Sequence, residues 1–165
     1  MLTPIKTLVQ RALRLCAKLD WLGPLGIRLV VGVAFVLTGK GKLGDLDKVT
    51  SFFTDLHIPF PHANAVFVAT VELVCGSLLV IGLGTRIAAL LLTATMAVAF
   101  VTAIVPNSES FLDLFSTIEL TYLAIFVWLI VSGAGRISID HLIARRARAG
   151  AELPHARANL ASGRS

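Results

Sequence analysis

Two carboxylates stand inside long apolar stretches of this sequence. Glu72 lies near the middle of the 21-residue stretch from Ala63 to Leu83, and Glu119 lies in a second one. A charged side chain at the centre of a bilayer costs about 2.5–3.5 kcal/mol or more, unless it is protonated, paired or turned toward other helices. Tyr122 follows Glu119 by three residues and so shares its helical face, while Lys42 ends an earlier apolar stretch. We therefore expect Glu72, Glu119, Tyr122 and Lys42 to line a polar pocket inside a helical bundle.

The chemistry that these side chains could support is limited in kind. Buried acids in membrane helices mark proton relays, ion paths or ligand sites, and they can equally serve to bond one helix to another. Lys40 and Lys42 lie at the outer end of the first span and Glu119 lies in the outer half of the fourth. We therefore expect Lys40 or Lys42 to reach inward toward Glu119. Neutral partners across the helices are expected among four threonines: Thr38, Thr70, Thr93 and Thr95.

The elements that carry these residues are predicted from apolar blocks. Hydrophobic residues make up 56% of the chain and charged residues 15%, and the mean hydropathy is +0.82, which indicates an integral membrane protein. About 20 apolar residues span a bilayer as a helix. Four spans are predicted: Leu25–Gly39, Ala63–Leu83, Ile87–Val105 and Leu114–Val131. A short surface helix is predicted between the first two, from Leu46 to Leu56.

The fold class is thus all-α, a four-helix transmembrane bundle with an N-terminal amphipathic helix at the membrane surface. Residues 1–21 place apolar and basic side chains on opposite helical faces, as interfacial helices do, and a partner-binding helix is the alternative. Residues 22–142 form the transmembrane domain, and residues 143–165 form a basic, disordered cytoplasmic tail. Arg28, one turn inside the first span, is expected to extend back to the lipid headgroups.

The distribution of charge predicts the topology. Of fifteen lysines and arginines, four lie in the N-terminal segment, one at Arg86 and six after the fourth span. They flank apolar blocks instead of interleaving with aromatic residues, so they indicate membrane orientation and exclude a nucleic-acid surface. Both termini are predicted to be cytoplasmic, in a multi-pass protein of a bacterial-type inner membrane.

Several common sites are excluded by their missing patterns. Cys16 and Cys75 lie far apart, so neither a dithiol motif nor a zinc site is predicted. His57 and His62 flank a proline-rich loop, but their spacing matches no metal-ligand pattern, and we predict no metal. There is no phosphate-binding loop and no nucleophile elbow, so the residues identify no self-sufficient active site and leave enzymatic activity open.

Four motifs, in order, give the chain a family resemblance. They are the stretch Arg28 to Leu43 ending in Gly-Lys-Leu, the Ile58-Pro-Phe-Pro61 turn, Glu72-Leu followed by Gly82-Leu-Gly-Thr-Arg86, and Gly133-Ala-Gly-Arg136-Ile-Ser-Ile-Asp140. With these the chain resembles the DoxX family of small four-helix membrane proteins, over roughly residues 28–142. It departs from the family pattern at three positions: His57 stands for a glycine, Ala134 for a proline and Ile137 for a tyrosine.

The resemblance implies a membrane subunit associated with redox systems, since relatives include a subunit of thiosulfate:quinone oxidoreductase. Quinone is then the cofactor to expect, and the partners are the lipid bilayer, an oxidoreductase subunit and further copies of the chain. Our first hypothesis is a component of a redox or quinone-linked complex, with Glu72 and Glu119 in its pocket. The alternatives are a structural or assembly protein without chemistry, and a small transporter or proton path.

Overall fold

All regular secondary structure in the described part of the chain is helical. The computed structural model describes residues 14, 17, 19, 21–108, 110–135 and 137–146, and no strand occurs among them. The all-α prediction is therefore confirmed. The amphipathic N-terminal helix predicted for residues 1–21 and most of the predicted tail lie outside the described residues. Helix continues over residues 139–146, so the first four residues of that tail segment are helical.

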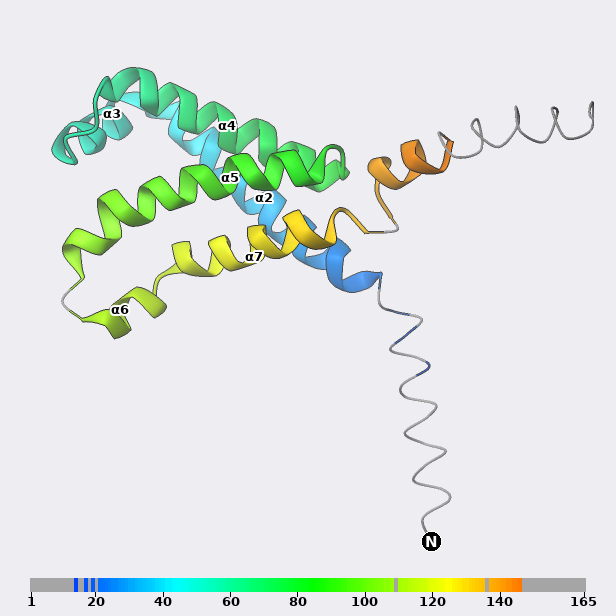
Figure 1. The fold of residues 1–165 in the computed structure, drawn as a ribbon. Coiled ribbons are helices and arrows are strands. Elements are labelled where there is room, and N and C mark those ends of the chain that lie inside the picture. The colour runs from blue at the N-terminus through cyan, green and yellow to red at the C-terminus, as the bar shows by residue number, and fades with distance from the viewer. Residues whose placement is uncertain are drawn as a thin grey trace, which may run out of the picture.

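Within the residues that the structure describes, three helices are long and apolar enough to cross a membrane, and Figure 1 shows how they are arranged. They are α2 (Leu22–Gly44), α4 (Pro61–Ile81) and the continuous rod Thr85–Asn107, in which α5 (Thr85–Ala99) runs on through a π-helical turn, η1 (Phe100–Ile104), and a 3-10 turn, η2 (Val105–Asn107). Helix α2 does not end at Gly39 as predicted. It continues five residues further, because the lysines after Gly39 are good helix formers, and it stops only where Asp45 accepts a hydrogen bond from the backbone of Lys48 as the N-cap of α3.

The fourth apolar stretch is broken, contrary to the predicted span Leu114–Val131. Its first part is α6 (Phe111–Phe115), which begins with a capping box between Ser110 and Asp113. Two hydroxyl residues, Ser116 and Thr117, donate back to carbonyls of α6 and end it, as such side chains do when they compete with the helical ladder. The second part, α7 (Ile118–Ser132), has 15 residues and is shorter than an ordinary span.

The helices pack in the order α2, α4, α5, α7, with α3 (Leu46–Asp55) lying on the start of α4. The short helix predicted for Leu46–Leu56 is therefore confirmed, and it ends at Asp55. The pairs α2–α4 and α5–α7 make the most extensive contacts. The core lies where the four meet, and its fully buried side chains include Leu79, Leu92, Phe126 and Leu129.

Helices α2 and α4 approach each other through glycine. A Cβ atom on Gly39 would lie 2.5 Å from the backbone nitrogen of Leu73, and one on Gly76 would lie 2.8 Å from the nitrogen of Val36. Gly32 lies two turns before Gly39. A Cβ atom on Gly32 would lie 3.0 Å from the carbonyl oxygen of Gly76. In lipid, the hydrophobic effect does not drive helices together, because the lipid tails are as apolar as the side chains. Helices associate there through close van der Waals packing, which small residues allow.

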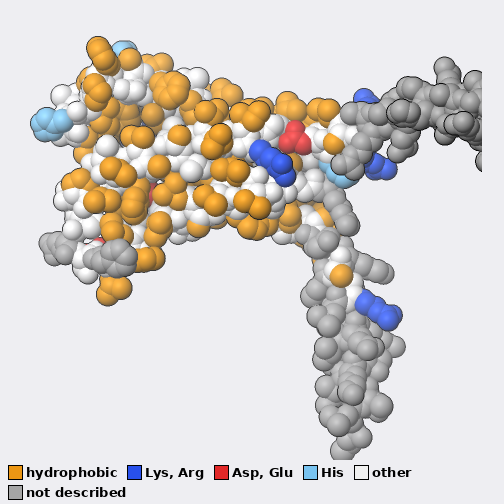
Figure 2. All heavy atoms as spheres, viewed as in Figure 1, with side chains coloured by type: hydrophobic (Ala, Val, Ile, Leu, Met, Phe, Trp, Pro, Cys, Tyr) orange, Lys and Arg blue, Asp and Glu red, His pale blue; other side chains and the backbone are white. Residues whose placement is uncertain are grey.

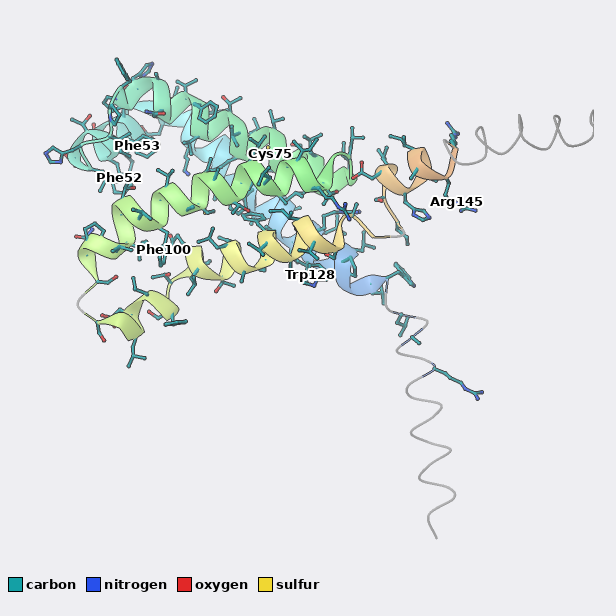
Figure 3. All side chains as sticks on the ribbon, in the orientation of Figure 1. Phe52, Phe53, Cys75, Phe100, Trp128 and Arg145 are labelled. Carbon is teal, nitrogen blue, oxygen red and sulfur yellow. The ribbon has the colours of Figure 1, made fainter. Side chains whose placement is uncertain are left out.

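The outer surface of the helices suits a bilayer. On the face drawn in Figure 2, hydrophobic side chains cover the length of the helices, and lysine and arginine gather toward one end. Large apolar residues such as Val30, Ile87 and Val131 have mostly exposed side chains on the outside of the bundle. Figure 3 places Phe52, Phe53 and Phe100 toward the opposite end from Arg145 and places Trp128 toward the Arg145 end, so aromatic side chains lie toward both ends of the molecule.

Candidate functional site

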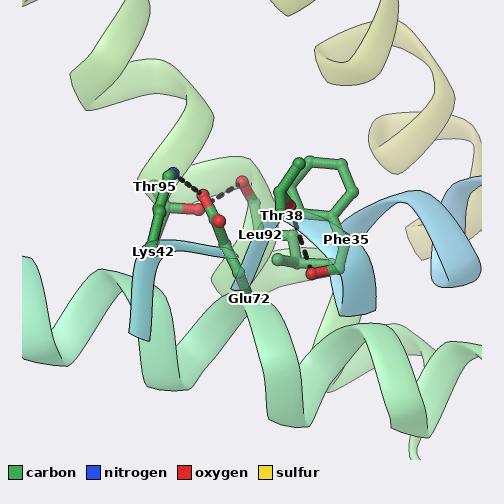
Figure 4. Close-up of polar contacts among 6 residues, drawn as sticks. All are labelled: Phe35, Thr38, Lys42, Glu72, Leu92 and Thr95. Carbon is green, nitrogen blue, oxygen red and sulfur yellow. Dashed lines mark hydrogen bonds and ion pairs between the residues drawn. The ribbon is translucent and has the colours of Figure 1, made fainter. Parts of the chain in front are cut away.

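The side chain of Glu72 is buried and forms an ion pair with Lys42 (Figure 4). Glu72 lies in the middle of α4 and is 1% exposed, whereas Lys42 lies in the last turn of α2 and is 33% exposed. The Lys42 ammonium donates to Glu72 Oε1 at 2.5 Å. The pair therefore joins the middle of α4 to the last turn of α2, with its acid inside the bundle and its lysine partly exposed.

The glycine contact explains why Lys42 meets this acid. Because Gly39 touches the backbone between Ala69 and Leu73, the next turn of α2 passes directly over Glu72. Lys42 follows Gly39 by three residues and so shares its face. The prediction that Lys40 or Lys42 reaches Glu119 is wrong, since sequence position gives the depth of a side chain but not the helix that it faces.

One oxygen of the Glu72 carboxylate is left without a donor. Oε2 is fully buried and makes no hydrogen bond with any group among the described residues. The nearby hydroxyls are engaged elsewhere, because Thr38 donates to the carbonyl of Phe35 and Thr95 donates to that of Leu92 (Figure 4). The predicted threonine partners across helices are thus wrong: Thr38, Thr70, Thr93 and Thr95 each donate to a carbonyl of their own helix.

The ion pair lies at the wall of a cavity of about 1020 Å³. Its walls come from α2, α3, α4, the α5 rod and the start of α7, and most of its lining is apolar. Phe52, Phe53 and Phe67 contribute aromatic rings, and Val68 and Val98 contribute aliphatic surface. The polar lining residues are Thr38, Lys42, Asp45, Lys48, Asn64, Glu72, Thr95, Thr102 and Glu119.

Three of the four predicted pocket residues meet in this cavity. Lys42, Glu72 and Glu119 all line it, with Glu119 in the first turn of α7. Tyr122 does not. Its ring packs edge-on against Phe35, with centroids 5.0 Å apart, and stacks on Phe126, so it belongs to the aromatic part of the core.

The cavity also has a wall that the sequence did not indicate. The π-helical turn η1 widens the α5 rod, and Thr102, Ala103 and Ile104 of this turn line the cavity. Such π-turns inside helices occur frequently at functional sites. Nothing in an uncharged apolar stretch distinguishes a π-turn from an ordinary one, so no sequence signal was at hand.

At the opposite end of the bundle, Arg28 is buried instead of reaching the headgroups. It is 2% exposed, and its guanidinium donates to the carbonyl of Ala134 at 2.6 Å and to that of Ile137 at 2.9 Å. The expectation that Arg28 extends to lipid is wrong, because the loop after α7 folds back over it. Gly82, with φ of +71°, leaves the space: a Cβ atom there would lie 2.6 Å from the guanidinium.

The two sequence motifs at this end bind each other. The Asp140 carboxylate accepts from the backbone N–H groups of Gly84 and Thr85, and the Asp140 N–H donates to the carbonyl of Gly82. A carboxylate at a helix N-terminus satisfies otherwise unpaired donors of α5 and complements the helix dipole. This arrangement is structural, since both oxygens of Asp140 are already used.

His57, His62 and Cys75 take part in the packing and backbone geometry of the fold. Within the ranges that the structure describes, no three metal-binding side chains come together. His62 Nδ1 lies 3.3 Å from the Thr50 hydroxyl and links α3 to α4. His57 adopts a left-handed backbone with φ of +55°, which accounts for a glycine fitting this position. Cys75 is buried in the core, as expected of a small apolar side chain.

The site can therefore bind, but its described residues do not assemble a nucleophile with a base. It offers an ammonium donor beside an unpaired carboxylate oxygen, at the wall of a large apolar space. These groups are of the kind that could contact the polar head of an otherwise apolar molecule.

Comparisons with known proteins place these features in a family. The DoxX family model matches residues 23–104, from the start of α2 to the end of η1. An uncharacterised membrane protein of Mycobacterium tuberculosis is 34% identical over 134 residues, which cover 74% of this chain and 82% of that protein. No solved structure matches the chain.

Proposed function

The chain belongs to the DoxX family of membrane proteins, and we propose that it is a membrane subunit of a redox or quinone-linked oxidoreductase system. In this proposal its cavity holds the head of a lipid-soluble ligand of the quinone type. The protein supplies binding and orientation, and a partner oxidoreductase supplies the chemistry.

The observation that carries the proposal is the ion pair between the half-buried Lys42 and the buried Glu72, at the wall of the cavity of about 1020 Å³. Binding sites for small molecules are typically clefts of about 300–1,000 Å³, mostly apolar and with a few well-placed polar groups. A quinone head fits this description, because its carbonyl oxygens accept hydrogen bonds and its ring and tail are apolar. Lys42 offers the donor, and Phe52, Phe53 and Phe67 offer the apolar walls.

Charge and helix order support a placement in the membrane. We infer that α7 crosses with the three long helices as a fourth span, helped by local thinning of the bilayer, which modest length mismatch permits. Arg86 and the basic C-terminal segment then lie at the same, cytoplasmic end, while α3 with Asp45, Asp47 and Asp55 lies at the outer end. Both termini are cytoplasmic in this arrangement.

A structural role is the second candidate, and one observation favours it. The Lys42–Glu72 pair joins α2 and α4, the helices with the closest backbone contact, and could serve only to fix their register. Charged pairs inside membrane proteins are used in this way as well as in ligand sites.

The proposal is tested by purifying the protein from its native membranes in mild detergent and identifying the proteins that accompany it by mass spectrometry. A stoichiometric oxidoreductase partner supports the redox role, and purification of the chain alone counts against it. Glu72→Gln separates the two candidates. If the variant folds and keeps its partner but loses the redox activity of the complex, the pocket is functional; if the variant fails to fold, the structural role gains.

A further inference from the structure

We infer that the cavity binds the reduced, hydroxyl-bearing form of its ligand in preference to the oxidised form. In chemical terms, the preferred occupant is a lipid-soluble hydroquinone and the weaker one is the corresponding quinone. This inference rests on the proposed function and adds to it a choice between two oxidation states of the same molecule.

The first observation is the state of the Glu72 carboxylate. Oε1 accepts from Lys42, whereas Oε2 is buried and has no donor within the described part of the chain. A carboxylate oxygen only accepts hydrogen bonds, so what it lacks is a donor. Buried polar groups are nearly always satisfied in folded proteins, and an unpaired one is a place where an ordered water, an ion or a ligand can supply the missing partner.

The second observation is that the hydroxyl and amide groups of the cavity lining do not provide this donor. Thr38 and Thr95 both line the cavity, but their hydroxyls donate to carbonyls of their own helices. The side-chain amide of Asn64 donates to the carbonyl of Pro59. The Lys42 ammonium donates to Oε1 and makes no hydrogen bond to Oε2, and its two other N–H groups can donate to a ligand.

The two oxidation states differ in what they bring to this site. A hydroquinone carries O–H groups, so one hydroxyl can donate to Glu72 Oε2 while its oxygen accepts from Lys42. A quinone carries only carbonyl acceptors, so it can accept from Lys42 but must face Oε2 with another acceptor. Leaving a buried acceptor unpaired weakens binding by roughly tenfold or more, by the usual cost of such groups.

The experiment uses the full-length protein, purified in detergent and kept free of oxygen, with binding measured by isothermal titration calorimetry. The probes are a short-chain benzoquinone, its hydroquinone and the dimethyl ether of that hydroquinone, in which both hydroxyl donors are blocked. We expect the hydroquinone to bind about tenfold more tightly than the quinone, and the ether to bind no better than the quinone. Equal binding of hydroquinone and quinone, or tighter binding of the quinone, overturns the inference.

Two variants locate the preference. Glu72→Gln replaces Oε2 or its neighbour by an amide donor, which can satisfy a quinone carbonyl, so the preference for the hydroquinone should disappear. Asp47→Asn makes the same carboxylate-to-amide change on exposed α3, outside the cavity lining, and should leave the preference intact. A preference that survives Glu72→Gln contradicts the assignment. If that variant does not fold, the ether comparison on the unaltered protein decides the matter alone.

The failure of this inference is distinct from that of the proposed function. If quinone and hydroquinone both bind, but equally, the proposed function stands and only the preference is lost. If neither binds, the proposed function fails and the preference fails with it.

Discussion

Asp140 holds the N-terminus of α5 by accepting the backbone N–H of Gly84 at 2.7 Å, across 56 positions of sequence. Its second oxygen accepts the N–H of Thr85 at 3.0 Å. The loop that carries Asp140 also covers Arg28, which donates to the carbonyls of Ala134 and Ile137. Three helices, α2, α5 and α7, are thus tied together at the end of the bundle away from the cavity.

Asp140→Asn should destabilise the protein by about 1–2 kcal/mol, because one carboxylate oxygen becomes an amide that faces the N–H of Gly84 or Thr85. Thermal unfolding in mild detergent, followed by gel filtration of the remaining folded fraction, measures the effect. Asp55→Asn, at the exposed end of α3, is the matched control and should change the midpoint little. Equal midpoints for both variants would show that the cap contributes nothing.

Gly39→Ala should loosen the contact between α2 and α4. The new Cβ atom would lie 2.5 Å from the Leu73 nitrogen, a backbone atom that cannot turn aside, and overpacking of this kind costs about 1–3 kcal/mol. Gly26→Ala is the control in the same helix, with nothing within 4 Å of the new atom. It should be neutral or stabilising by up to about 1 kcal/mol, because alanine favours helix. Similar thermal midpoints for the two variants would refute the close approach of α2 and α4.

The two halves of the ion pair should differ in their cost when removed. Lys42→Met leaves the Glu72 carboxylate buried without a partner and should cost about 3 kcal/mol. Glu72→Gln leaves a lysine that is one-third exposed and can turn to water, so it should cost about 1 kcal/mol.

The double variant, which carries Lys42→Met together with Glu72→Gln, tests whether the two side chains interact energetically. Its loss of unfolding free energy should be smaller than the sum of the two single losses, by more than the ~0.5 kcal/mol of independent sites. Additive losses, or a larger loss from Glu72→Gln than from Lys42→Met, would contradict the pairing.

His57→Gly should stabilise the protein by about 1 kcal/mol, since the left-handed backbone at φ of +55° costs a residue with a Cβ atom roughly that amount. Asp55→Gly, two residues earlier at the end of α3, should instead destabilise it, because glycine weakens a helix. Chemical denaturation of both variants measures the difference, and a loss of stability in His57→Gly would be the contrary result.

The sequence predicts the apolar helices well, because long apolar blocks signal burial in lipid whatever their neighbours. It predicts their ends less well. Helix α2 runs past Gly39 because the lysines there favour helix, and the fourth stretch breaks because Ser116 and Thr117 bond to the backbone of α6. Both outcomes depend on local hydrogen bonds that composition does not reveal.

The site was predicted in part for a similar reason. Lys42, Glu72 and Glu119 were singled out as charged residues within or at the end of an apolar stretch, and they share one cavity. The partner of Lys42 was not predicted, because it depends on the glycine contact that sets the register of α2 against α4. Arg28 and Asp140 were missed as a structural unit, since their partners are carbonyl and N–H groups that every residue carries.

The most direct test of the account is whether the cavity holds a lipid-soluble ligand in the native membrane. The protein would be purified in mild detergent, and its bound lipids extracted and identified by mass spectrometry. Ala94→Trp places an indole in the cavity that Ala94 lines, and Ala124→Trp makes the same change at an exposed alanine of α7 outside the lining. We expect a quinone-type lipid to be bound to the unaltered protein and to Ala124→Trp, and to be lost from Ala94→Trp. Equal amounts in all three proteins, or none in the unaltered one, would contradict it.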